Sequence, residues 1–194
     1  MDDEERAAIS ALRTGDIGGL ASLVRLHQIP ALRATYALTG DRQLAEDLVA
    51  DAFLTAYDRI AQYDPQRPFG PWFYRIVVNS ALKAIRRVER FRHTDTGALF
   101  AEQVDPTPDP AIEVATREMR RGVVRALRTL PPPQRAALIL RYYLDLDERT
   151  IAQTLGCPIG TVKWRLHAGK ERIRQSLAGT PDRTWAQYLT GDIP

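Results

Sequence analysis

The chain has 194 residues, of which 44% are hydrophobic, and its 27 basic and 24 acidic side chains leave a net charge of only +3. Its one cysteine, Cys157, excludes an internal disulfide, and together with three histidines it matches no zinc-binding spacing. No apolar run approaches the roughly 20 residues of a membrane span, and the acidic start MDDEERAAIS is unlike a signal peptide, which predicts a cytoplasmic chain without membrane insertion.

Apolar residues recur at helical spacing along almost the whole chain, and alternating runs of β-branched residues are missing. We therefore expect an all-α fold. The clearest interruption is QVDPTPDP, residues 103–110, where three prolines prevent a helix and hold the chain extended. We place a Pro-rich linker at 94–110 between two small helical domains, 1–93 and 111–178, with a tail at 179–194.

In the first domain, an apolar stripe at helical spacing predicts a helix that faces the core. The stripe consists of Leu44, Leu48, Val49, Ala52, Phe53, Ala56, Tyr57 and Ile60. The opposite face carries Asp47, Asp51 and Asp58 with Leu54 among them. Acidic groups beside an exposed apolar side chain suit docking onto a basic partner, and a solvated acidic face is an equally good interpretation of the pattern.

The next segment, YDPQRPFGPWFYRIVVNSALKAIRRVERF, predicts a stiff loop followed by an aromatic-rich helix. Polar and basic side chains at steps of three or four share one stripe of this helix, which predicts contact with phosphates. The stripe consists of Arg75, Asn79, Lys83, Arg86 and Arg90. Trp72 and Tyr74 are candidates for stacking on unpaired bases, and burial of Trp72 in the core is the alternative.

In the second domain, a helix at about 111–129 should end at LPPPQ, and the last of these prolines can open the next helix. The segment DERTIAQTLGCPIGTVKWRLHAGKERIRQSL then has the spacing of a helix-turn-helix. Ile151 and Leu155 should face inward, and Gly156 should supply the turn. Cys157 at the inward turn position is interpreted as a buried small hydrophobe without chemistry.

The second helix of this motif carries the side chains that we expect to meet DNA. Thr161 is expected to cap it. The outward side chains that would meet base edges are Lys163, Trp164, His167, Lys170 and Glu171. Those that would reach phosphates or partner surfaces are Arg165, Arg172 and Arg174.

Three segments together resemble, in order and spacing, the two regions of extracytoplasmic-function sigma factors of the sigma-70 family. These segments are AEDLVADAFLTAYDRI, FGPWFYRIVVNSALKAIRR and LRTLPPPQRAALILRYYLDLDERTIAQTLGCPIGTVKWRLHAGKERIR. The resemblance implies that the first domain docks on the clamp of the largest subunit of core RNA polymerase and helps melt the minus-ten promoter element. It implies that the second domain reads the minus-thirty-five element as duplex DNA. It further implies contact with the polymerase flap region, an anti-sigma factor as regulator, and no cofactor.

Carried over by residue, the resemblance implies three sets of contacts. The polymerase contacts are Asp47, Leu48, Asp51, Phe53 and Leu54. The minus-ten contacts are Arg67, Phe69, Trp72, Arg75, Asn79, Lys83 and Arg86. The minus-thirty-five contacts are Thr161, Lys163, Trp164, Arg165, His167 and Lys170. Two positions depart from the family pattern: Ala50 replaces a usual glutamine, and Ala168 replaces a frequent arginine.

Two other function classes remain. A helix-turn-helix repressor or activator would explain residues 147–177 but leaves the aromatic and basic segment WFYRIVVNSALKAIRR without a role. An enzyme is disfavoured because the sequence has no phosphate-binding loop, nucleophile elbow, metal cluster or paired carboxylates in an apolar pocket. We therefore predict a transcription initiation factor that binds DNA and polymerase and performs no catalysis.

Overall fold

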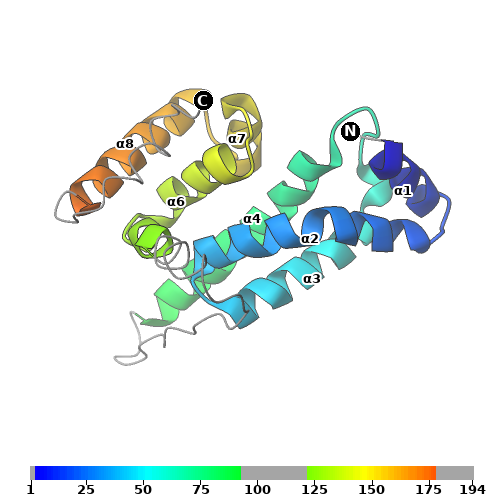
Figure 1. Ribbon diagram of the computed structural model, residues 1–194, viewed down its shortest axis with the longest axis horizontal. Helices are drawn as coiled ribbons and strands as arrows, with labels where there is room; N and C mark the ends of the chain where they lie inside the picture. The colour runs from blue at the N-terminus through cyan, green and yellow to red at the C-terminus, as the bar shows by residue number, and fades with distance from the viewer. Residues whose placement is uncertain (1–2, 93–121, 178–194) are drawn as a thin grey trace, which may run out of the picture.

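The computed structural model describes residues 3–92 and 122–177 of the chain (Figure 1). Within these residues all regular structure is helical and no strand occurs, as expected from the periodicity. The first half contains α1 (Asp3–Arg13), α2 (Gly18–Thr39), α3 (Arg42–Asp58), the short 3₁₀ helix η1 (Ile60–Gln62) and α4 (Phe69–Arg92). The expected linker at 94–110 and the tail at 179–194 lie outside the described residues.

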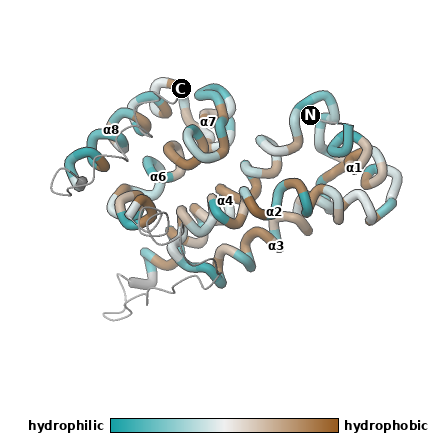
Figure 2. Tube along the Cα trace, in the orientation of Figure 1, coloured by the Kyte–Doolittle hydropathy of each residue, from teal (hydrophilic) through white to brown (hydrophobic). Residues whose placement is uncertain are grey.

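The first four α-helices pack around their own apolar core. α1, α3 and α4 each pack on α2, and α3 also packs on α4. The ring of Phe53 from α3 stacks on Phe73 from α4, with the two centroids 4.3 Å apart. α1 approaches α2 so closely that a Cβ atom on Gly19 would lie 2.2 Å from the carbonyl oxygen of Ala8. Figure 2 shows hydrophobic stretches along the helices of this bundle.

The turn between α2 and α3 is set by residues at the two helix ends. Gly40 closes α2 with a φ of 71°, in the left-handed region that glycine adopts without steric cost. Asp41 is the N-cap of α3, and its carboxylate accepts a hydrogen bond from the backbone N–H of Leu44 at 3.0 Å. Because both ends are fixed, α3 begins directly after α2.

The second half contains the helical residues 122–128, α6 (Pro132–Leu138), the π-helical turn η2 (Ile139–Tyr143), α7 (Glu148–Leu155) and α8 (Ile159–Leu177). α6 begins within the proline run, because the first turn of a helix does not use the missing N–H groups. α7 ends at Gly156 with a φ of 61°, and α8 packs on α7, so the expected helix-turn-helix is present. Asp147 caps α7 by accepting from the backbone N–H of Thr150 at 2.7 Å.

The second half does not stand apart from the first. α6 and η2 pack on α2, and α7 packs on α4, so the helix-turn-helix lies over one side of the bundle (Figure 1). The apolar core of the second half therefore includes five buried residues of α2 and α4: Ala34, Leu38, Val78, Ala81 and Leu82. The structure thus has a bundle core and a second core that the two halves share.

Candidate protein and nucleic-acid interfaces

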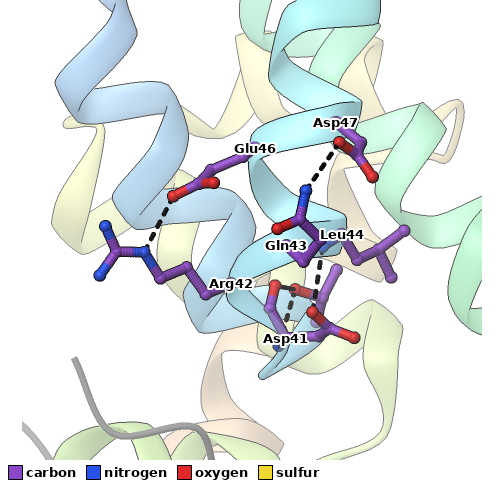
Figure 3. Close-up of polar contacts among 7 residues, drawn as sticks. Asp41, Arg42, Gln43, Leu44, Glu46 and Asp47 are labelled. Carbon is purple, nitrogen blue, oxygen red and sulfur yellow. Dashed lines mark hydrogen bonds and ion pairs between the residues drawn. The ribbon is translucent and has the colours of Figure 1, made fainter.

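The outer side of α3 has the mixed acidic and apolar surface expected from the sequence. We call this surface, formed by Asp47, Asp51, Leu54 and Asp58, the acidic face. Its three aspartates are exposed, and Leu54 is 59% exposed. The amide of Gln43 donates to Asp47 Oδ1 at 3.3 Å, one helical turn away (Figure 3). The acidic face is thus available to a partner.

Three other residues of α3 bear on the two expectations for this helix, packing in the core and contact with the polymerase. Phe53 is buried against Phe73, so its side chain cannot reach a partner unless the core opens. Leu48 is half-buried and packs against the shared core. Tyr57 was expected in the core but is 37% exposed, because it lies at the edge of the apolar stripe.

An aromatic cluster supports the loop before α4. The Tyr63 ring lies 5.1 Å from the Trp72 ring, and the Phe69 ring lies 5.5 Å from it. The Tyr63 hydroxyl donates to the carbonyl oxygen of Arg67, which ties the loop to this cluster. Phe69 is fully buried, so its side chain supports the loop from inside and does not reach the surface. Trp72 is half-buried, with part of its surface packed on the cluster and part exposed.

The basic stripe of α4, defined above by Arg75, Asn79, Lys83, Arg86 and Arg90, lies at the surface. Four of its members are exposed and Asn79 is half-buried. Arg67 is also exposed, and its Nε lies 3.3 Å from Asp64 Oδ2 within the loop. A row of cations that begins beside an aromatic cluster suits a nucleic-acid strand, because phosphates follow the cations while bases stack on rings.

A polar cluster beneath this surface was not foreseen from the sequence. His27 of α2 lies between Glu5 of α1 and Tyr74 of α4, with its Nε2 2.8 Å from Glu5 Oε1 and its Nδ1 3.4 Å from the Tyr74 hydroxyl. Burial, and then the nearby Tyr143 and Glu5, raise the pKa of Tyr74 to about 12. Nothing in the spacing of these residues predicts that they meet, because they belong to three separate helices.

On α8, three of the residues expected to contact DNA are exposed. Lys163, Trp164 and His167 lie at the surface, and Trp164 is 60% exposed. Lys163 Nζ also lies 3.8 Å from Glu148 Oε2 of α7. Exposed side chains of this kind suit a recognition helix.

Three further α8 residues are placed differently from expectation. Thr161 does not cap the helix: α8 begins at Ile159, and the carbonyl of Pro158 accepts from the backbone N–H of Thr161 at 2.9 Å. Arg165 is half-buried and donates to the sulfur of Cys157 at 3.3 Å. Lys170 is half-buried, with its Nζ 4.8 Å from the centre of the Tyr142 ring.

Cys157 itself is half-buried and packs against the shared core, close to the inward position expected for it. Within residues 3–92 and 122–177, no group of three or more histidine, cysteine, aspartate or glutamate side chains is arranged to hold a metal ion. In the same part of the chain, no helix combines the length and apolar character needed to cross a membrane.

Known protein families match both halves of this arrangement. Sigma-70 region 2 matches residues 23–91, and Sigma-70, region 4 matches residues 120–173. The ECF RNA polymerase sigma-E factor of Escherichia coli (strain K12) is 30% identical over 154 residues, which cover 76% of this chain and 79% of the relative. The chain belongs to the extracytoplasmic-function (ECF) sigma factors of the sigma-70 family. It is thus a factor of bacterial transcription initiation.

Two other sigma factors also match most of the chain. The ECF RNA polymerase sigma factor SigW of Bacillus subtilis (strain 168) is 28% identical over 176 residues, covering 87% of this chain and 94% of the relative. The sigma factor RpoE from Bartonella quintana, solved in complex with the anti-sigma factor NepR, has 26% sequence identity and a TM-score of 0.63. The match covers 78% of this chain and 92% of that one.

Proposed function

We propose that this ECF sigma factor binds core RNA polymerase through the acidic face of α3 and directs the enzyme to promoters through α4 and α8. The observation that carries the proposal is the presence of three separate exposed surfaces on one small chain. One surface is acidic with an exposed leucine, and the other two are basic with aromatic side chains. A protein that joins a polymerase to DNA needs surfaces of both kinds.

For polymerase binding, Asp47, Asp51 and Leu54 are the residues that support the proposal best. Leu54 offers apolar area that a partner would remove from water, and the carboxylates would steer a basic partner into place. Leu48 would contribute at the margin of this contact, since it is half-buried. We further propose that the second half contacts the polymerase flap region, as the family resemblance implies.

For the minus-ten element, we propose that the basic stripe follows the phosphates of a separated strand while Trp72 stacks on one of its bases. Trp72 is already held on one side by Tyr63 and Phe69, so its exposed part has a fixed position. A held ring loses little conformational freedom when a base stacks on it. Arg67, Arg75, Lys83 and Arg86 would then supply the charge.

For the minus-thirty-five element, we propose that α8 enters the major groove of the duplex. Lys163, Trp164 and His167 are exposed and would meet base edges or backbone. Arg165 and Lys170 already interact within the protein, so they would position α8 or reach phosphates after a change of rotamer.

We also propose that an anti-sigma factor regulates the protein. The support is the Bartonella quintana sigma factor, whose solved structure includes the anti-sigma factor NepR. A sigma factor acts by binding, so we assign no catalytic residue and no cofactor to this chain. Its proposed place of action is the cytoplasm, on the nucleoid when bound to polymerase.

The alternative is a repressor or activator that uses the helix-turn-helix without replacing a sigma factor. It explains α7 and α8 but gives no role to the acidic face or to the basic stripe.

Run-off transcription with purified, sigma-free core polymerase and a genomic promoter library tests the proposal directly. We expect transcripts that start at specific promoters only when the protein is added, and their upstream sequences would reveal both elements. Binding to DNA with no core-dependent initiation would favour the repressor or activator instead.

A further inference from the structure

We infer that Glu5 of α1 and His27 of α2 are positioning residues for the capture of the minus-ten strand. In this role they do not touch DNA. They fix the first turn of α4, and with it the ring of Trp72 on which a base would stack. The inference rests on the proposed function, because the position of this ring matters for initiation only if a base stacks on it.

His27 is held at both of its ring nitrogens. Its Nε2 lies 2.8 Å from Glu5 Oε1, and its Nδ1 lies 3.4 Å from the hydroxyl of Tyr74 on α4. An ionised carboxylate only accepts hydrogen bonds, so Nε2 is the donor in the contact with Glu5. Both nitrogens lie in the plane of the imidazole. Two anchors on separate helices therefore fix the orientation of that plane.

The first turn of α4 rests on this imidazole. The centroid of the Phe69 ring lies 5.2 Å from that of His27. At Gly70 a Cβ atom would lie 3.3 Å from Tyr74 Cε2 and 3.5 Å from His27 Cε1, so the backbone itself passes close to both rings. Phe69 is fully buried and begins α4. A rotation of the His27 ring would therefore displace the start of the helix.

Aromatic packing extends this support from Phe69 to Trp72. The Phe69 ring lies 5.5 Å from the Trp72 ring and 5.7 Å from the Tyr63 ring, and the rings of Tyr63 and Trp72 lie 5.1 Å apart. Rings packed at these distances have preferred relative orientations. Trp72 is half-buried, so the packing of its buried part decides where its exposed part lies. A displacement of Phe69 would thus move the surface that meets a base.

The chemistry of Glu5 indicates a role beyond filling space under this cluster. Its residue is only 7% exposed. Burial, and then Glu5 and Asp64, raise the pKa of Tyr63 to about 12, which shows that the carboxyl group lies near the loop as well as near His27. Burial of a carboxyl group costs free energy unless hydrogen bonds offset it, and an aliphatic side chain would fill the same space without that cost. We attribute the carboxyl group to the orientation that it gives to His27.

Promoter opening by the complete holoenzyme tests this inference. Glu5→Leu keeps a side chain of similar size but removes the acceptor for His27, whereas Glu5→Gln keeps an oxygen that can accept. We expect Glu5→Leu to lower the permanganate reactivity of minus-ten thymines at least about threefold, because a small misplacement of a binding group removes much of its effect. Its affinity for core polymerase should stay unchanged. Glu5→Gln should retain most of the reactivity.

Leu12→Ala is the control for a merely structural role. Leu12 lies on the same helix as Glu5 and is buried in the bundle core, so its truncation should lower the melting temperature at least as much as Glu5→Leu does. At a temperature where both variants are folded, Leu12→Ala should open the promoter as well as the unsubstituted protein. Equal loss of opening in the two variants, or no loss in Glu5→Leu, would overturn the inference. If Glu5→Leu does not fold, Tyr74→Phe replaces it, since this variant removes only the hydroxyl that faces His27 Nδ1 and should show a smaller defect of the same kind.

The position of Trp72 is also measurable without DNA, which separates this inference from the proposed function. In a Trp164→Phe and Trp185→Phe background, Trp72 is the one remaining tryptophan of the chain's three. Acrylamide quenching of its fluorescence should increase with Glu5→Leu and stay unchanged with Leu12→Ala. If the unsubstituted protein opens no promoter with core polymerase, the proposed function is wrong. The quenching then decides the positioning role alone, and equal quenching with and without Glu5→Leu would overturn it.

Discussion

His27 Nε2 lies 2.8 Å from Glu5 Oε1, and this contact joins α1 to α2 inside the bundle. Both side chains are largely buried, and the other ring nitrogen of His27 faces the hydroxyl of Tyr74 on α4. The histidine ring also packs on Phe69, with the two centroids 5.2 Å apart. The pair therefore ties the first helix of the chain to the aromatic cluster that supports Trp72.

We predict that His27→Ala and Glu5→Ala each lower the free energy of unfolding by about 1–3 kcal/mol, because each removes the contact between these two buried polar side chains. The double variant should lose less free energy of unfolding than the two single variants combined, because the contact between the two side chains can be lost only once. Urea denaturation of the three variants measures this coupling. Strictly additive losses would show that the two side chains stabilise the bundle independently.

Tyr74 should make the protein sensitive to alkaline pH. Its pKa is raised from 10.0 to about 12, chiefly by burial, so the folded protein keeps the phenolic proton more firmly than the unfolded chain does. The stability that this provides is complete below pH 10 and is lost as pH rises toward about 12. Tyr74→Phe should therefore flatten the fall in unfolding free energy over that range. An unchanged pH profile would show that Tyr74 loses its proton equally easily in both states.

Asp147 is the N-cap of α7, and we expect Asp147→Ala to destabilise the protein by about 0.5–2 kcal/mol in thermal or urea unfolding. Hydrogen bonding to Thr150 lowers the pKa of Asp147, so the stabilisation is present above its ordinary pKa of 3.8 and is lost as pH falls below that value. Asp147→Asn is the matched control, because asparagine caps as well but does not titrate. The Asp147→Asn variant should keep most of the free energy of unfolding, and that free energy should no longer fall at acid pH through this residue. A destabilisation as large as that of Asp147→Ala would contradict the capping role.

Leu54→Lys should weaken binding to core polymerase at least about tenfold without changing the melting temperature, because Leu54 is exposed and would lose only its contact with the partner. Ile29→Lys is the matched control: Ile29 is 57% exposed on α2, outside the acidic face. Fluorescence anisotropy of labelled protein titrated with core polymerase measures both. Equal loss of affinity in the two variants would place the polymerase contact elsewhere.

Trp72→Ala and Trp164→Ala should affect different steps of initiation. We expect Trp72→Ala to lower the extent of promoter melting, read by permanganate reactivity of thymines, while core binding stays unchanged. Trp164→Ala should instead lower binding to duplex DNA of the minus-thirty-five element. Each variant is the control for the other, since both replace an indole that is at least partly exposed. A loss of core binding by Trp72→Ala would contradict its proposed role in melting.

Local sequence signals predicted much of the architecture. Helical periodicity predicted the all-α fold, and Gly156 after an apolar repeat predicted the helix-turn-helix turn. Exposure of Leu54 followed from its place opposite the apolar stripe of α3. The cap of α8 was predicted wrongly at Thr161, because the helix already begins after Pro158, three residues earlier than a cap at Thr161 would place it.

The sequence alone therefore determined the set of helices, the helix-turn-helix and the charged faces, because these features depend on residues within one or two helical turns of each other. Only the tertiary structure decided which side chains meet across helices. It brought His27 to Glu5 and Tyr74, buried Phe69, and placed Arg135 on the carbonyl of Leu38. These contacts join residues up to 97 positions apart, and spacing along a chain carries no information about such distant partners.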